Sequence, residues 1–252
     1  MQLNTMKVLV TGAASGMGRH FCLRLAEAGA MVAAADVNED GLASLVIEGG
    51  GKIKAYTLNV ADEENVKTVM RSASQDLGGL NGLVNNAGIF RDGLIVRQDR
   101  ETGAVKTMSL KNWQQVLDVD LTGPFLCTRE FAAQHIEAGG TSAVVVNISS
   151  IARHGNMGQG NYSAAKAGLV ADTVAWAKEL SRYGIRFGAI APGFVDTPIL
   201  QGMKQEVLDK MLKAVPLRRV GSPDEIFAGV RFIMECDYFT GRCIDIDGGM
   251  RL

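Results

Sequence analysis

The chain has 252 residues, of which 47% are hydrophobic and 21% are charged. This composition is typical of a soluble globular protein with a sizeable core, and it excludes a largely disordered chain. The formal net charge is -1, from 26 basic and 27 acidic side chains, and no segment concentrates Lys and Arg. We therefore expect no nucleic-acid partner.

The cysteine pattern and the hydropathy of the chain indicate the compartment in which we expect the protein to work. The four cysteines are scattered and form no CxxC pair: Cys22, Cys127, Cys236 and Cys243. Neither a zinc site nor a disulfide framework is indicated, so we expect no metal and a reducing, cytoplasmic setting. The first strand-like run begins at Lys7, so we expect no signal peptide, and no apolar run approaches membrane-spanning length, so we expect no membrane span.

Short runs of β-branched residues alternate with amphipathic stretches along the chain. The predicted strands are Val8–Val10, Val32–Ala35, Ile53–Leu58, Leu83–Asn85, Ala143–Ile148, Arg186–Ala191 and Cys243–Ile246. Helices are predicted at about residues 16–28, 39–48, 62–77, 111–137, 161–182 and 223–235. This alternation predicts an α/β fold: a single Rossmann-type, doubly wound parallel sheet of about seven strands with helices on both faces. No Pro- or Ser-rich linker divides the chain, so residues 1–252 are expected to form one domain.

A glycine-rich turn follows the first predicted strand, in Thr11-Gly12-Ala13-Ala14-Ser15-Gly16-Met17-Gly18. Glycines in such a turn let the backbone approach a pyrophosphate at the N-terminus of the next helix. Asp36 ends the second strand about eighteen residues after Gly18. A carboxylate there accepts hydrogen bonds from an adenosine ribose and repels a 2′-phosphate, so the two features indicate a dinucleotide site.

The TGxxxGxG spacing of this turn, with Asn85-Asn86-Ala87-Gly88 after the fourth strand, resembles the short-chain dehydrogenase/reductase family. The resemblance continues through Tyr162-Ser163-Ala164-Ala165-Lys166, Pro192-Gly193 and Asp247-Gly248-Gly249, and so covers essentially the whole chain. It implies an oxidoreductase that transfers a hydride between a nicotinamide cofactor and a secondary alcohol or its ketone.

The resemblance also implies which residues line the cofactor site. They are Gly12, Ser15, Gly16, Met17, Gly18, Asp36, Val37, Asn59, Val60, Asn86, Ala87, Gly88, Tyr162, Lys166, Pro192, Gly193, Val195 and Thr197. Residues 59–60 are expected to border the adenine, residues 86–88 to line the ribose, and residues 192–197 to flank the nicotinamide. Family members that prefer NADP often have a basic residue at one of the positions occupied here by Ser15 and Val37. Neither residue is basic, which favours NAD as the cofactor.

Tyr162 and Lys166 are four residues apart on a predicted helix, which places them on one face. A tyrosine is a poor base at neutral pH, but a nearby ammonium and a positively charged nicotinamide both favour the phenolate. Tyr162 is thus the expected acid-base residue.

The family places a serine before this tyrosine to hydrogen-bond the substrate oxygen. Alignment of the fifth strand selects Ser150, whereas the usual spacing of thirteen residues from the tyrosine selects Ser149. We favour Ser150 and leave Ser149 open. His154 lies in the same loop, and we interpret it as a residue without a catalytic role.

Two departures from the family pattern stand out. Asp120 occupies the position where the family usually has asparagine, whose backbone carbonyl helps to hold a water that links the lysine to solvent. The segment from Asp92 to Met108 is longer than is typical, and its pattern predicts a small hairpin that turns at Thr102-Gly103. We interpret this segment as a surface insertion.

The segment at about 196–215 corresponds to the family's mobile substrate lid. Its apolar positions have the spacing of an amphipathic helix: Ile199, Leu200, Met203, Val207, Leu208, Met211 and Leu212. Such a face suits an acyl chain, although the same residues could simply pack on the domain.

The resemblance leaves several functions open. It is strongest to 3-oxoacyl reductases and 3-hydroxyacyl dehydrogenases, and polyol and steroid dehydrogenases are alternatives. A non-catalytic binding module on the same scaffold is a further alternative, which Asp120 alone supports. Family members are commonly tetramers built through two long helices, so a homotetramer is expected.

Overall fold

Seven parallel strands form the central sheet in the order β3-β2-β1-β4-β7-β8-β9. The strands are β1 (Lys7–Thr11), β2 (Met31–Asp36), β3 (Ile53–Thr57), β4 (Gly82–Asn85), β7 (Ala143–Ile148), β8 (Ile185–Pro192) and β9 (Arg242–Ile246). The computed structural model describes residues 1–202 and 205–251, apart from the side chains of Ile199 and Gln201. The predicted sheet is confirmed. Its order reverses between β1 and β4, and such a switch point is where open α/β sheets bind ligands beyond the carboxyl ends of their strands.

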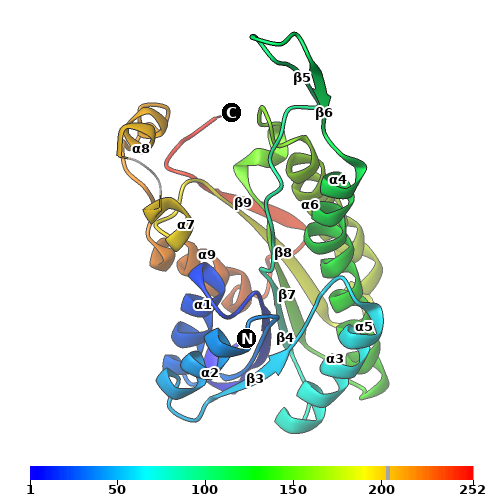
Figure 1. Ribbon diagram of the computed structural model, residues 1–252. Coiled ribbons are helices and arrows are strands. Elements are labelled where there is room, and N and C mark those ends of the chain that lie inside the picture. Colours follow the sequence, from blue (N-terminus) through cyan, green and yellow to red (C-terminus); the bar gives the residue numbers. More distant parts are fainter. Residues whose placement is uncertain (203–204, 252) are drawn as a thin grey trace.

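Helices cover both faces of the sheet (Figure 1). One face carries α1 (Gly16–Glu27), α2 (Glu39–Glu48) and α9 (Pro223–Glu235), and the other carries α3 (Glu63–Leu77), α5 (Gly123–Glu137) and α6 (Gly160–Leu180). Successive side chains of β1 alternate between the two cores: Val8 and Val10 pack on one side and Leu9 on the other. Burial on both faces explains why the strands are nearly continuous apolar runs.

The predicted helix over residues 111–137 is interrupted. Helix α4 (Leu110–Leu117) passes into a π-helical turn (Asp118–Thr122), and α5 follows directly. In this turn the Gly123 N–H donates to the Asp118 carbonyl, five residues earlier. Pro124 has no N–H and therefore cannot make the α-helical bond to residue 120. Such turns occur often at functional sites, and this one contains Asp120.

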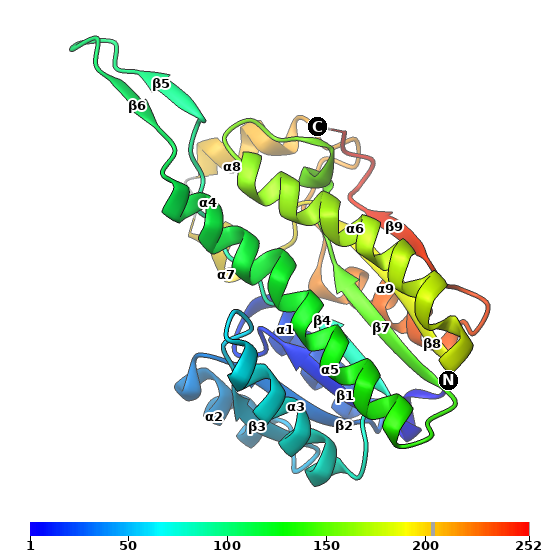
Figure 2. The same cartoon turned by 90° about the vertical axis from the view of Figure 1, so that its right-hand side faces the viewer.

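The predicted hairpin within residues 92–108 is confirmed. Strands β5 (Val96–Gln98) and β6 (Val105–Thr107) pair antiparallel in a sheet of their own, and the Gly103 N–H donates to the Asp99 carbonyl at the tip. Figure 2 shows the hairpin projecting from the body of the molecule, beyond the start of α4.

The lid segment holds two helices rather than the single predicted one. They are α7 (Pro198–Gln201) and α8 (Gln205–Leu212); Met203 lies outside the described residues. Helix α8 buries no side chain, and Val207 is 46% exposed. Only Leu212, at its end, packs on a small cluster that includes Val215 and Met250. Across residues 1–202 and 205–251, no helix is long and apolar enough to span a membrane.

Candidate active site

Three buried polar side chains meet beside the carboxyl ends of β4 and β7. Tyr162 and Lys166 come from the first two turns of α6, and Asp120 comes from the π-helical turn. Their exposed fractions are 9%, 3% and 0%, respectively. Because α6 packs against this turn, residues more than forty positions apart in the sequence form one cluster.

The Lys166 ammonium is the centre of this cluster. Its Nζ lies 3.2 Å from Asp120 Oδ2, donates a 3.1 Å hydrogen bond to the Ile148 carbonyl, and lies 5.4 Å from the centroid of the Tyr162 ring. The other carboxylate oxygen, Asp120 Oδ1, accepts a 2.8 Å hydrogen bond from the Ile89 N–H. Asp120 therefore joins the lysine to the segment that follows β4.

Gly88 allows this arrangement by its lack of a side chain. A Cβ at this position would lie 2.7 Å from Asp120 Oδ2 and 3.5 Å from Lys166 Nζ. The first distance is shorter than a carbon and an oxygen can approach, so any larger residue would displace the carboxylate. Gly88, the glycine of the Asn-Asn-Ala-Gly motif, thus leaves room for the ion pair between Asp120 and Lys166.

The phenol of Tyr162 is subject to opposing influences. Burial raises its pKa and outweighs the Lys166 charge, which lowers the pKa. The Asp120 carboxylate raises the pKa further, while a hydrogen-bonding interaction with Ser150 lowers it. Aspartate at position 120 thus opposes the effect of the lysine on the tyrosine, which an asparagine there would not do.

The two partners of the ion pair also influence each other's pKa. Burial raises the pKa of Asp120, although Lys166 and the Ile89 N–H oppose the rise. Burial by itself lowers the pKa of Lys166, but attraction to Asp120 and Tyr162 outweighs it, so the lysine pKa is raised. The ammonium is therefore held in its charged form.

The two candidate serines have different surroundings. Ser149 is 2% exposed, and its hydroxyl donates a 2.9 Å hydrogen bond to the Lys166 carbonyl, so it is occupied inside the structure. Ser150 is half-buried, and its Oγ accepts a hydrogen bond from the Ala152 N–H while also interacting with Tyr162. The geometry supports Ser150. His154 is exposed at the end of the following short helical turn.

The glycine-rich turn has the shape that a dinucleotide requires. A Cβ on Gly18 would overlap the Gly12 carbonyl oxygen, and a Cβ on Gly12 would lie 2.8 Å from the Ala87 Cα. The Asn86 amide donates to the Thr11 and Gly12 carbonyls at 3.0 and 3.2 Å, and its buried Oδ1 has no partner among the described residues. The close backbone contact and the unpaired acceptor fit a bound cofactor.

Asp36 stands at the end of β2, beside this turn. Its Oδ2 accepts from the Ala14 N–H at 2.9 Å, and its Oδ1 accepts from the Asn38 N–H at 3.0 Å. These two bonds fix the carboxylate against the glycine-rich turn, and the half-buried side chain keeps an accessible edge. The neighbouring Val37 is 65% exposed and offers no positive charge.

The remaining predicted cofactor residues lie along the same edge of the sheet. Ser15 caps the start of α1, with Gly16 and Met17 in its first turn, and Asn59 and Val60 follow β3. Val60 is 6% exposed and packs over Gly123.

Beyond β8 the predicted positions differ in their exposure. Gly193 directly follows the strand, Thr197 precedes α7, and Val195 is buried in the core and 5% exposed. The Val195 side chain is therefore committed to packing, and only its backbone is free to serve a ligand. Pro192 ends β8 itself and is also buried.

Sequence reasoning missed two neighbours of Tyr162. Phe90 places its ring centroid 4.6 Å from that of Tyr162. Asn161 is fully buried; its amide donates to the Arg91 and Asn112 carbonyls, and its Oδ1 accepts from the Tyr162 N–H. Phe90 lies just after the Asn-Asn-Ala-Gly motif, and Asn161 lies just before the tyrosine. Their nearness to these motifs was the only sequence signal that could have pointed to them.

Comparison with known proteins gives the family of the chain. The family profile described as enoyl-(acyl carrier protein) reductase matches residues 12–251. The chain belongs to the short-chain dehydrogenase/reductase family. It is 40% identical to a 3-oxoacyl-(acyl-carrier-protein) reductase of Thermotoga maritima, over 99% of each chain. It is 34% identical to a (3R)-3-hydroxyacyl-CoA dehydrogenase of Canis lupus familiaris, over 99% of this chain and 98% of the relative.

Membership in this family makes the chain an oxidoreductase that acts on CH–OH groups with a nicotinamide dinucleotide. A reductase of Synechocystis with the same name as the Thermotoga protein is 37% identical over 98% of each chain. The similarity thus extends over nearly the whole chain.

Proposed function

We propose that this protein catalyses reversible hydride transfer between NAD(H) and a 3-oxoacyl or 3-hydroxyacyl thioester. One observation carries the proposal: Tyr162, Lys166 and Ser150 lie together beyond the carboxyl end of β7, at the same edge of the sheet as the glycine-rich turn that follows β1. The names of the full-length relatives support the substrate class. The apolar side of α8 supports a hydrophobic acyl chain, since no side chain of this helix is fully buried and only Leu212 packs on a core cluster.

In this proposal the residues of the site have different tasks. When bound, the nicotinamide supplies or accepts the hydride. Ser150 donates a hydrogen bond to the substrate oxygen, and Tyr162 gives that oxygen a proton during reduction and removes it during oxidation. Lys166 stabilises the phenolate through its charge at 5.4 Å from the ring. The Asp120 carboxylate holds Lys166 in place. The backbone carbonyl of the same residue would help to hold the water that links the lysine to solvent.

Asp36 supports NAD over NADP as the cofactor. Its carboxylate is fixed by two backbone N–H groups beside the expected adenosine ribose, where it would repel a 2′-phosphate. Asp36→Asn removes the charge but keeps an acceptor, so we expect kcat/KM with NADPH to rise about tenfold relative to NADH. Asp40→Asn, an exposed carboxylate on α2, is the control. Equal wild-type efficiency with both cofactors would refute the assignment.

The activity is tested with a panel of purified substrates and NADH absorbance. We expect 3-oxoacyl thioesters to be reduced with a kcat/KM at least about a hundredfold above those of simple ketones, polyols and steroids. Of these compounds, only the thioesters carry an acyl chain that can contact the apolar side of α8. If a polyol or a steroid is preferred, the substrate class is wrong. If no substrate is turned over although NADH binds, the protein is a non-catalytic binding module.

We also expect a homotetramer assembled through α5 and α6, as in related enzymes. On α5, Phe125 is 42% exposed and lies beneath the Arg129 guanidinium, 5.5 Å from it. Aromatic residues and arginine are enriched at subunit contacts. Light scattering of the purified protein tests the expectation.

A further inference from the structure

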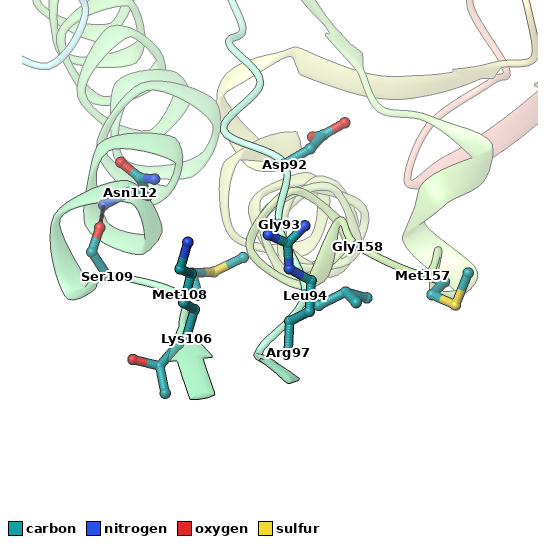
Figure 3. Close-up of a pocket in the computed structure, with 11 residues that line it drawn as sticks. Asp92, Gly93, Leu94, Arg97, Lys106, Met108, Ser109, Asn112, Met157 and Gly158 are labelled. Carbon is teal, nitrogen blue, oxygen red and sulfur yellow. Dashed lines mark hydrogen bonds between the residues drawn. The ribbon is translucent and has the colours of Figure 1, made fainter. Parts of the chain in front are cut away.

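A pocket of about 540 Å³ lies between the inserted hairpin, the start of α4 and the loop before α6. Arg97 and Lys106 of the hairpin line it together with Asp92, Ser109 and Asn112. Figure 3 shows the Arg97 and Lys106 side chains extending from the hairpin into the same space. None of these residues is needed for hydride transfer.

Arg97 and Lys106 face each other directly across the hairpin. They are paired in the β5–β6 register, so both side chains leave the same face with Cβ atoms about 5 Å apart. Like charges in this position destabilise a hairpin. Within the described part of the chain, neither side chain forms an ion pair or a hydrogen bond. Two unneutralised cations at this distance are suited to a shared anion, and phosphate is the anion that arginine and lysine commonly bind.

Other charges around the pocket agree with an anion at its hairpin end. Ser109 caps α4, and the unbonded N–H groups of the first turn of that helix favour negative charge. Asp92 is the one carboxylate among the lining residues. Its Oδ2 accepts from the Gln159 side chain at 3.0 Å, and it forms no ion pair with either hairpin cation. Asp92 is therefore tied to the α6 end, away from the paired charges.

The pocket adjoins the catalytic tyrosine. The buried amide of Asn161, next to Tyr162, donates to the Asn112 carbonyl at 3.3 Å and to the Arg91 carbonyl at 3.0 Å. Asn112 lines the pocket, and Phe90 contacts the Tyr162 ring. Leu94, Met108 and Met157 add apolar side chains to its lining. The pocket thus lies next to the segments that hold Tyr162, and its lining combines cationic and apolar side chains.

We propose that Arg97 and Lys106 bind the phosphate of the phosphopantetheine arm that carries the acyl group. This inference rests on the proposed function and adds to it a binding site for the carrier. The arm occurs both in coenzyme A and on acyl carrier proteins, and its 4′-phosphate is the feature they share. An extended, flexible pantetheine can lie along the apolar side chains of the pocket, with its thioester directed toward Tyr162.

The test compares a 3-oxoacyl 4′-phosphopantetheine thioester with the same thioester of pantetheine, which lacks the phosphate. We expect the wild-type protein to prefer the phosphorylated substrate about tenfold in kcat/KM, mainly through KM. The double variant Arg97→Gln, Lys106→Gln should lose that preference and keep its activity on the pantetheine thioester. The control, Arg71→Gln with Arg100→Gln, removes the same charge at exposed positions outside the pocket and should keep the preference.

Parallel assays with 3-oxoacyl-CoA and a 3-oxoacyl carrier protein distinguish the two sources. A loss in the double variant with either carrier supports the proposal and identifies the carrier that uses the site. An unchanged preference overturns it, as does an equal loss on both pantetheine substrates. A change of oligomeric state in the double variant would make the hairpin a subunit contact and also overturn it. If the wild type reduces none of these thioesters but acts on another alcohol, the proposed function itself has failed.

Discussion

Replacing Asp120 by asparagine tests how the buried ion pair controls the tyrosine. The new side chain would be nearly isosteric and would keep an oxygen for the Ile89 N–H, which now bonds Asp120 Oδ1 at 2.8 Å. The substitution would remove the negative charge 3.2 Å from Lys166 Nζ. The lysine would remain close to the phenol, so its charge would act on Tyr162 without opposition. Packing and the backbone carbonyl of position 120 should be preserved.

The distances give the size of this effect. Lys166 Nζ is 5.4 Å from the Tyr162 ring centroid and 3.2 Å from Asp120 Oδ2, so the carboxylate oxygen is at most about 8.6 Å from the ring. With an effective dielectric constant of about 20, an ammonium at 5.4 Å contributes about 3 kcal/mol, and a carboxylate at 8.6 Å opposes it by about 2 kcal/mol. Removing the carboxylate should move the midpoint of a rate profile governed by Tyr162 by about 1.4 pH units.

The direction follows from the chemistry of the phenol. Oxidation of the alcohol needs the phenolate, so its rate rises with pH through the pKa of Tyr162. Without the Asp120 charge the phenolate is favoured, and this rise should move to lower pH. Reduction needs the neutral phenol, so its alkaline fall should move to lower pH as well. At pH 7 we expect activity within about tenfold of wild type, because the residues that touch the substrate are unchanged.

The assay is the pH dependence of kcat/KM in both directions, with cofactor affinity measured separately. A midpoint that stays in place or moves to higher pH would refute the electrostatic reasoning. A loss beyond about a hundredfold would instead show that the carboxylate takes part in the chemistry. A large gain would mark Asp120 as an impairment and would favour the binding-module alternative.

Three other perturbations have expected outcomes. Tyr162→Phe should lower kcat at least about a hundredfold with little change in the Kd for NADH, whereas Lys166→Ala should impair both, as stopped-flow and fluorescence titration can show. Ser150→Ala should lower kcat about a hundredfold, whereas Ser149→Ala should act mainly on stability and lower the free energy of unfolding by about 1 kcal/mol, since the Ser149 hydroxyl is bonded to the Lys166 carbonyl inside the core; the reverse pattern in kcat would reassign the serine. The pKa of Glu225 is lowered to about 2, mainly by its bonds to an arginine and to a helix cap. Its stabilising contribution is therefore complete above about pH 4.5 and is lost as the pH falls toward 2, so the Tm of Glu225→Gln should approach that of wild type in acid; a constant difference in Tm would contradict this.

Local patterns in the sequence were enough to predict the sheet and the cofactor turn. Each strand of the main sheet was predicted to within one residue at either end, because strands buried on both faces are continuous apolar runs. The pairing of Tyr162 with Lys166 was also predictable, since a spacing of four residues places two side chains on one helix face. The hairpin turn at Thr102-Gly103 depends on neighbouring residues alone and was likewise visible.

The tertiary structure decided everything that depends on distant segments meeting. No sequence pattern shows that Asp120 lies 3.2 Å from Lys166, because a π-helical turn on one segment and the start of α6 on another set that distance. Only the packed structure shows that the Lys166 carbonyl engages the Ser149 hydroxyl, which supports our proposal of Ser150. In the sequence, Arg97 and Lys106 are indistinguishable from ordinary surface charges. The strand register of the folded chain places them opposite each other in the lining of a pocket. Burial, charge separation and pocket shape are properties of three-dimensional packing, and a periodicity along the chain records only which face a side chain takes.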